Sequence, residues 1–167
     1  MAAREIGTPG ANFRIATTSG NGLRADGVLA QLAAFEARRD GPEGTRNHVT
    51  AAWKLCDESR YAEALKEVLK TPETHPHYYH SVVLCGHIRR MTVDLEGAER
   101  DLNRAVKMSK RRPEAYIHRA WLRLDQNSIE EGIEDAIRAR ELINPGGKLE
   151  ADICEILDLL HGAQAKS

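Results

Sequence analysis

Small residues recur along this chain at a constant interval of 34 residues. Two series share this step: Ala64, Ala98 and Gly132 in one, and Ala52, Gly86 and Ala120 in the other. The interval is the length of a helix–turn–helix unit, and such units stack because none can bury its apolar face alone. Small residues also let two helices approach closely. The spacing therefore predicts an all-α solenoid of helical hairpins.

Apolar periodicity and helix-breaking residues divide the chain into helical segments. The first 21 residues are rich in Gly, Thr, Asn and Ser, which predicts a flexible tail. The predicted helices are 23–39, 45–57, 61–70, 77–91, 95–109, 113–126, 129–143 and 148–161. The first of these is an extra N-terminal helix, and the next six form three hairpins. Residues 22–167 are thus expected to form a single domain.

The last predicted helix, 148–161, has two distinct sides. Leucine and isoleucine lie on one side, whereas Asp152, Glu155 and Asp158 lie on the other. A helix with a polar back suits the open apolar end of a repeat array. We therefore expect this helix to cap the third hairpin.

Composition excludes several classes of function. The formal net charge of −1 gives no general attraction to nucleic acid or anionic membranes. No apolar run approaches the length of a membrane span. The three cysteines, Cys56, Cys85 and Cys154, are widely spaced and predict reduced thiols in a cytoplasmic protein. No nucleophile, phosphate-binding or metal-binding motif occurs, so neither an enzyme nor a cofactor is expected.

Laid out at the 34-residue interval, the three segments resemble the tetratricopeptide repeat (TPR) family. Numbered from Thr45, Tyr79 and Pro113, they cover about residues 45–78, 79–112 and 113–147. The two small-residue series then fall at repeat positions 8 and 20. The large residue at position 17 is Tyr61, Leu95 and Ile129. Two positions depart from the family pattern: position 4 holds His48, Val82 and Tyr116, and position 7 holds Ala51, Cys85 and Arg119. The resemblance implies a right-handed superhelix.

The resemblance also implies that the first helix of each hairpin lines a concave groove. Both tryptophans of the chain, Trp53 and Trp121, fall at position 9, with His87 between them. An exposed tryptophan in a concave surface is a typical anchor of a protein interface, because it buries much apolar area at little entropic cost. We therefore expect an adaptor or scaffold that binds an apolar or amphipathic peptide segment. The predicted groove residues are Val49, Trp53, Val83, Leu84, His87, Arg90, Ile117, His118 and Trp121.

Other functions of the same fold stay open at this point. The groove could instead be filled by the chain's own helix 23–39, which carries Leu29, Leu32 and Phe35, in a structural assembly protein. Alternatively, the chain could be a partner-specific chaperone, because the translocator chaperones of type III secretion share this architecture. The basic clamp of TPR domains that bind heat-shock chaperones is not expected. The repeat positions that carry this clamp in those domains hold Val49, Trp53, Leu84, Glu114 and His118 in this chain. The expected state is a monomer or weak dimer.

Three further groups of polar residues are interpreted as structural. The histidines His75, His77, His80 and His87 are expected to be solvated loop and groove side chains rather than metal ligands. The basic run Lys107, Lys110, Arg111 and Arg112 suits a helix C-terminus. Glu130, Glu131, Glu134 and Asp135 are expected on the surface of an amphipathic helix. Arg90 and Arg119 could pair with acidic groups of a ligand, or Arg119, the departure at position 7, could lie on the outer seam instead.

Overall fold

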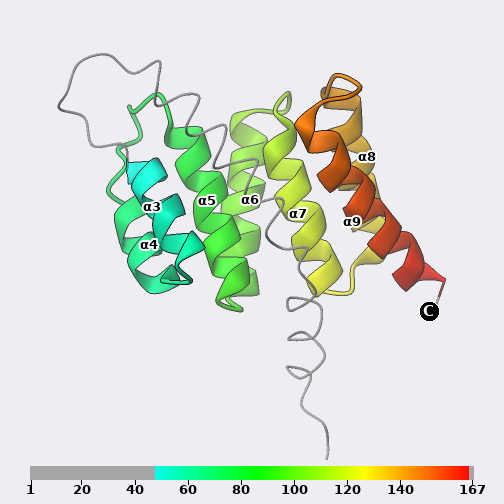
Figure 1. Ribbon diagram of the computed structural model, residues 1–167, viewed down its shortest axis with the longest axis horizontal. Coiled ribbons are helices and arrows are strands. Elements are labelled where there is room, and N and C mark those ends of the chain that lie inside the picture. Colours follow the sequence, from blue (N-terminus) through cyan, green and yellow to red (C-terminus); the bar gives the residue numbers. More distant parts are fainter. Residues whose placement is uncertain (1–47, 166–167) are drawn as a thin grey trace, which may run out of the picture.

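The computed structural model describes residues 48–165. Within this range the chain is all-α and contains no strand (Figure 1). The helices are α3 (His48–Asp57), α4 (Tyr61–Val68), α5 (Tyr78–Met91), α6 (Leu95–Met108), α7 (Pro113–Asp125), α8 (Ile129–Leu142) and α9 (Lys148–Gln164). The predicted tail and the predicted helix 23–39 lie outside the described residues.

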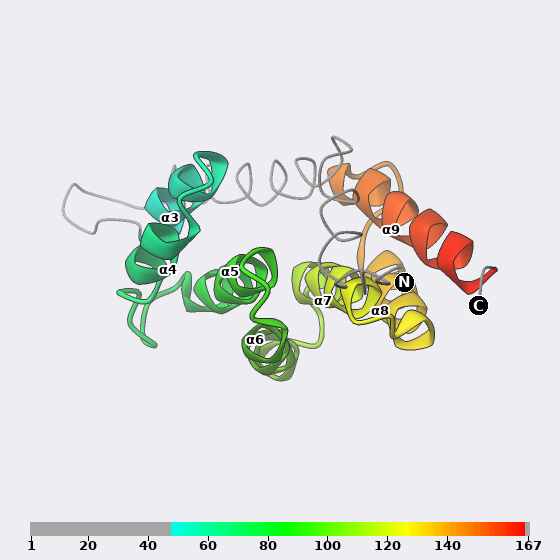
Figure 2. The same ribbon diagram turned by 90° about the horizontal axis from the view of Figure 1, so that it is seen from below.

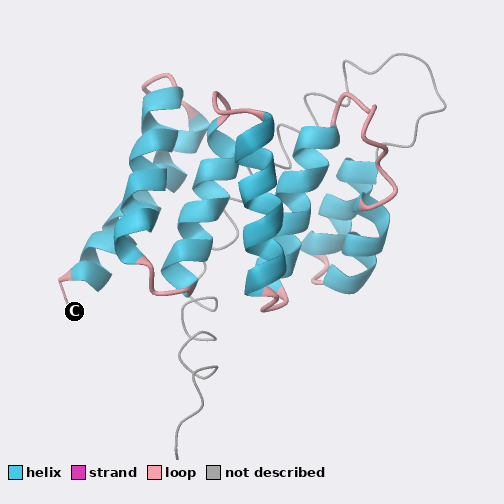
Figure 3. Cartoon of the chain, turned by 180° about the vertical axis from the view of Figure 1, so that it is seen from behind, coloured by secondary structure: helices cyan, strands magenta, loops and turns pink. Residues whose placement is uncertain are grey.

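The helices stack as hairpins in two layers. α3 packs with α4, α5 with α6, and α7 with α8, and each hairpin also contacts the next one. Figure 2 shows that α3, α5 and α7 lie on the inside of an arc, whereas α4, α6 and α8 lie on its outside. Seen from behind, short loops join the helices at the two ends of the layers (Figure 3). The prediction of an all-α solenoid of helical hairpins is confirmed.

Each hairpin turns through the same backbone motif. The residue with positive φ is Ser59 (59°), Val93 (65°) and Asn127 (58°) in the three turns. The next amide donates to a carbonyl five residues earlier: Arg60 to Leu55, Asp94 to Arg89 and Ser128 to Arg123. This is the Schellman arrangement, which satisfies carbonyl groups at a helix end. The 34-residue period is therefore present in the backbone geometry as well as in the sequence.

The small residues of the two series occupy the closest helix contacts. All four alanines among them are fully buried. A Cβ atom built on Gly86 of α5 would lie 2.6 Å from Cγ of Leu102 on α6. A Cβ atom on Gly132 of α8 would lie 2.8 Å from Cδ2 of Leu160 on α9. Larger side chains would force these helices apart, so the repeat spacing sets the packing.

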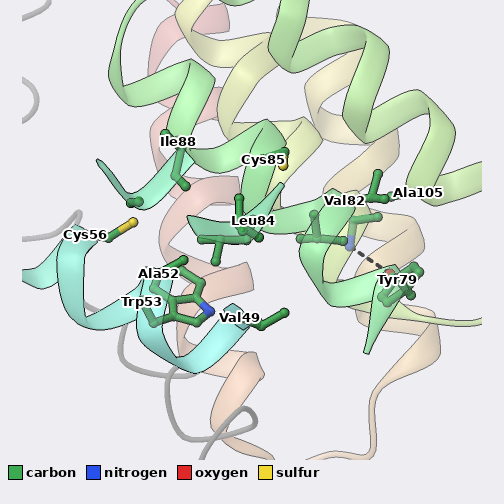
Figure 4. Packing of buried hydrophobic residues seen from close by; sticks show 14 residues of the cluster. Val49, Ala52, Trp53, Cys56, Tyr79, Val82, Leu84, Cys85, Ile88 and Ala105 are labelled. Carbon is green, nitrogen blue, oxygen red and sulfur yellow. Dashed lines mark hydrogen bonds between the residues drawn. The ribbon is translucent and has the colours of Figure 1, made fainter. Parts of the chain in front are cut away.

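The core is divided along the stack. One cluster joins the first two hairpins, and Leu84 of α5 lies in it opposite Val49, Ala52 and Trp53 of α3 (Figure 4). A second cluster joins the third hairpin to α9. The Tyr79 hydroxyl accepts a hydrogen bond from the Ala115 amide at 3.3 Å and so links the second hairpin to the third.

The C-terminal helix α9 caps the third hairpin as predicted, but its polar side differs from the prediction. Ile153, Ile156 and Leu160 are buried against α8 and α7. Asp152, which we expected on the solvent side, is also buried. α9 contacts two helices rather than one, so more than one side of it is covered. None of the described helices has the length and apolar character needed to cross a membrane.

Candidate functional site

The nine residues predicted to bind a partner come from the three helices on the inside of the arc. Eight of them are buried, and Trp121 is partly exposed. Leu84 packs between α3 and α5, so it belongs to the contact between hairpins (Figure 4). We call the other eight, which the repeat register predicts to face the inside of the arc, the inner face: Val49, Trp53, Val83, His87, Arg90, Ile117, His118 and Trp121.

A row of aromatic rings crosses the inner face from α3 to α7. The ring centroids of Trp53 and His87 lie 5.4 Å apart. Those of His87 and His118 lie 5.2 Å apart, with the rings edge to face. These separations are typical of favourable ring packing. The row thus joins the three hairpins through side chains at repeat positions 9, 9 and 6.

The ring row carries no charge near neutral pH. Burial, and to a lesser extent the neighbouring Arg90 charge, lowers the pKa of His118 to about 3. Burial also lowers the pKa of His87 well below its ordinary value, with smaller contributions from His118 and Arg90. Both imidazoles are therefore neutral, because a charged ring would lose its hydration without gaining an anion.

Arg90 is paired within the chain. Its Nη1 donates to Oδ2 of Asp125 at 2.9 Å, and its guanidinium carbon lies 5.8 Å from the ring centroid of Trp121. Burial raises the pKa of Asp125, while the Arg90 charge opposes this shift. The expectation that Arg90 is available to acidic groups of a ligand is therefore wrong for this arrangement, since Asp125 already occupies that role.

Three nitrogen atoms of the inner face are buried without a hydrogen-bond partner in the described part of the chain. They are Nε of Arg90, Nε1 of Trp121 and Nδ1 of His118. Met91 and Asp125, which contact the Arg90 guanidinium, are only partly buried, as is Leu124, the residue before Asp125 on α7. The C-terminal ends of α5 and α7 are thus the most accessible part of the inner face.

Arg119 belongs to a different network. Its Nε and Nη2 donate to the two carboxylate oxygens of Asp135 at 2.7 Å and 2.6 Å, and its Nη1 donates to Asn103 at 2.8 Å. The pair joins α7 to α8. Asp135 is buried, so its predicted surface position is wrong, and Arg119 is not available to a ligand acid in this arrangement. The arginine at position 7 instead serves the contact between the two helices.

The four histidines do not form one group. His75, His77 and His80 are neighbours, with ring centroids 5.3 Å and 6.0 Å apart along the series. His87 lies in the ring row instead. Burial, together with smaller effects of the Arg112 and His77 charges, lowers the pKa of His80 to about 4. His77 and His80 are buried rather than solvated as expected. Between residues 48 and 165 no three His, Cys, Asp or Glu side chains are arranged to hold a metal ion.

Asp125 is not among the nine predicted contact residues, although repeat position 13 is one of those that the TPR resemblance places toward the groove. A sequence signal exists, because Arg90 and Asp125 occupy repeat positions 12 and 13 of successive hairpins. Side chains at adjacent positions of neighbouring first helices can meet across the stack. Opposite charges at such positions therefore indicate a pair between repeats.

Comparison by sequence identifies no relative, since neither a protein-family model nor a characterised protein matches the chain. Comparison of structures does find similar folds. The type III secretion chaperone SycD of Yersinia enterocolitica, in complex with a peptide of the translocator YopD, aligns with a TM-score of 0.62 and 16% identity over 71% of this chain and 91% of SycD. A second SycD structure, an alternative dimer, gives a TM-score of 0.63 at 16% identity over 71% of this chain and 90% of that one.

The first TPR domain of Spaghetti (RPAP3), bound to the HSP90 peptide SRMEEVD, is also similar. Its TM-score is 0.61, with 22% identity over 71% of this chain and 90% of the domain. These identities are low, so the likeness concerns the fold. Together with the repeated turns, it shows that the chain has a TPR-like repeat fold.

Proposed function

We propose that this chain is a protein-interaction module, an adaptor or scaffold rather than an enzyme, whose inner face binds an apolar or amphipathic segment of a partner protein. The observation that carries the proposal is the uncharged ring row of Trp53, His87 and His118 across three stacked hairpins. Trp121, on the same helix as His118, stays partly exposed, and such a ring can bury a large area against a partner at little entropic cost. The proposed contacts are the eight inner-face residues, with Leu84 supporting them from the α3–α5 contact.

The similar folds support a peptide ligand. SycD was solved with a peptide of YopD and the RPAP3 domain with a peptide of HSP90. The likeness to SycD also favours the more specific alternative of a chaperone dedicated to one partner. An acidic peptide such as SRMEEVD is a poor candidate here. The places of the basic clamp hold apolar or aromatic side chains, one carboxylate at Glu114 and the neutral His118, so an incoming carboxylate would find no unpaired cation there.

A second candidate is that the inner face is filled by the chain's own residues 23–39. The observation that favours it is the burial of the inner face. Val83 is 0% exposed and Ile117 is 3% exposed, although both lie on first helices at the family's groove position. A surface kept open for a partner normally exposes apolar area. The predicted helix carries Leu29, Leu32 and Phe35 at helical spacing, which would suit such an apolar surface.

Calorimetric titration of the full chain with two peptides tests the first proposal. One is a neutral peptide of about twelve residues of Leu, Ala and Gln with blocked ends, and the other is SRMEEVD. We expect the neutral peptide to bind and the acidic one not to bind. Trp121→Ala, which removes the partly exposed ring of the inner face, should weaken binding about tenfold. The exposed Leu69 at the end of the outer helix α4 provides the control Leu69→Ala.

Absence of binding, or an equal loss in both variants, would contradict the proposal. The second candidate is tested by the variant Leu29→Gln, Leu32→Gln, Phe35→Gln in the full chain. If residues 23–39 fill the inner face, this variant should bind the neutral peptide more tightly, and its tryptophan fluorescence should shift to the red. Unchanged affinity and fluorescence would reject self-occupation.

A further inference from the structure

The three unpartnered nitrogens of the inner face lie on two adjacent helices. Arg90 is on α5, and His118 and Trp121 are on α7. Arg90 approaches both partners, since its guanidinium carbon lies over the Trp121 ring and its charge lowers the pKa of His118. The guanidinium and indole N–H groups can only donate hydrogen bonds. Together they form a compact group of donors on the face that we propose for partner binding.

Leaving such donors buried and unpaired is costly. Buried polar atoms in folded proteins nearly always have a partner, and a group without one needs an explanation. The other nitrogens of Arg90 do have partners, with Nη1 on Asp125 and Nη2 3.6 Å from Sδ of Met91. The missing bond is therefore specific to Nε. Residues 48–165 supply no acceptor to it or to the Trp121 indole, so an acceptor would come from a segment outside this range, and the proposed function makes that segment part of a bound partner.

The local charges indicate what kind of acceptor fits. The positive charge of Arg90 already faces the carboxyl group of Asp125 at 2.9 Å. Burial keeps His118 and His87 neutral, so these two rings add no positive charge to the site. A carboxylate ligand would have to give up its hydration and lie near Asp125, which is costly for a buried charge. An uncharged carbonyl oxygen meets the same donors without that penalty.

We propose that the C-terminal ends of α5 and α7 form a carbonyl-binding site, in which Nε of Arg90 and Nε1 of Trp121 donate to main-chain carbonyl oxygens of a bound apolar segment. This rests on the proposed function, because it names the polar anchor of the same inner face. Nδ1 of His118 is the third polar contact. The partly exposed Met91, Leu124 and Asp125 border the site, so a segment can approach the donors from this end.

The test uses the full chain and the neutral peptide of Leu, Ala and Gln, whose acceptors are all carbonyl groups. Each amide of the peptide is replaced in turn by an ester, which weakens the adjoining carbonyl as an acceptor. We expect one or two replacements to lower affinity about three- to tenfold. In Trp121→Phe, which keeps an aromatic ring but lacks the N–H, at least one of these replacements should have no effect. Trp53→Phe, which alters the ring row on α3, should retain the full pattern.

A second measurement follows peptide binding to the unaltered chain by NMR and does not require a variant that binds the peptide. The chain has two tryptophans, so its ¹⁵N–¹H spectrum contains two indole signals, which Trp121→Phe assigns. Peptide binding should move the Trp121 indole signal downfield and slow its hydrogen exchange. If the peptide binds but the ester pattern is unchanged in Trp121→Phe and the indole signal stays in place, the carbonyl site is refuted and the proposed function stands. If no peptide binds, both are refuted.

Discussion

Val93 occupies a backbone conformation that suits valine poorly. Its φ is 65°, and it is the C′ residue of the Schellman turn between α5 and α6. A left-handed conformation is a true outlier for a β-branched residue. The equivalent position of the third hairpin holds Asn127 with a φ of 58°, and asparagine tolerates this region because its short polar side chain can bond locally. We therefore predict that Val93→Asn stabilises the fold.

The magnitude follows from the strain and from the exposure of the side chain. The left-handed conformation costs a non-glycine residue roughly 1–2 kcal/mol, and less for asparagine. Val93 is 64% exposed, so its removal sacrifices little packing. The net gain in the free energy of unfolding should be about 1 kcal/mol. For a chain of this length that corresponds to a rise in Tm of roughly 3 °C.

Urea and thermal unfolding followed by circular dichroism measure the effect. The matched control is the reverse change at the equivalent turn, Asn127→Val, which should lower the free energy of unfolding by about 1 kcal/mol. The double variant should return close to the wild-type value, because turns in different hairpins act independently. If Val93→Asn lowers Tm, or if Asn127→Val leaves it unchanged, the explanation by backbone strain is wrong.

Three further changes should alter stability in stated directions. Gly86→Ala places a Cβ 2.6 Å from a buried leucine of α6 and should destabilise the fold by about 1 kcal/mol. Gly162→Ala is the control, because its Cβ meets no atom within 4 Å, and it should stabilise the fold slightly. The midpoints of urea unfolding compare the two variants. Asp94→Ala removes the side-chain cap of α6, a 3.0 Å bond, and should cost about 1 kcal/mol, while Ser128→Ala should change little because Ser128 makes no such bond. The pKa of His118 is about 3 in the folded chain and about 6.5 in the unfolded chain. Below about pH 6.5 the His118 ring therefore takes up a proton in the unfolded chain before it does so in the folded one. The contribution of His118 to the free energy of unfolding should be constant above that pH and should fall by up to about 1.4 kcal/mol per unit below it. Urea midpoints at pH 7.5 and 5.0 should show a smaller difference in His118→Asn.

The helices and their pairing could be predicted from the sequence because the signals agreed with one another. Pro113 begins α7, and the 34-residue series of small residues marks the tight helix contacts. The left-handed turn at Val93 could not be predicted, since valine gives no signal for that conformation. The repeat itself imposes it, because the same hydrogen bonds close all three turns.

The candidate site could be predicted only in part. The repeat register placed Trp53 and His87 on adjacent first helices, and their rings do meet. The register did not predict that these side chains are buried, because burial depends on everything packed against the inner face. Asp135 was missed for a similar reason. Its charge suggested solvent, but the bidentate bond from Arg119 compensates for its burial between α7 and α8.

Photo-cross-linking of the full chain to the neutral peptide tests the central claim most directly. A benzophenone group placed at each apolar position of the peptide, followed by mass spectrometry, identifies the residues that the bound segment touches. We predict that labels fall on α3, α5 and α7, with the strongest ones near Trp121 at the end of α7. Labels confined to the outer helices α4, α6 and α8 would contradict an inner binding face.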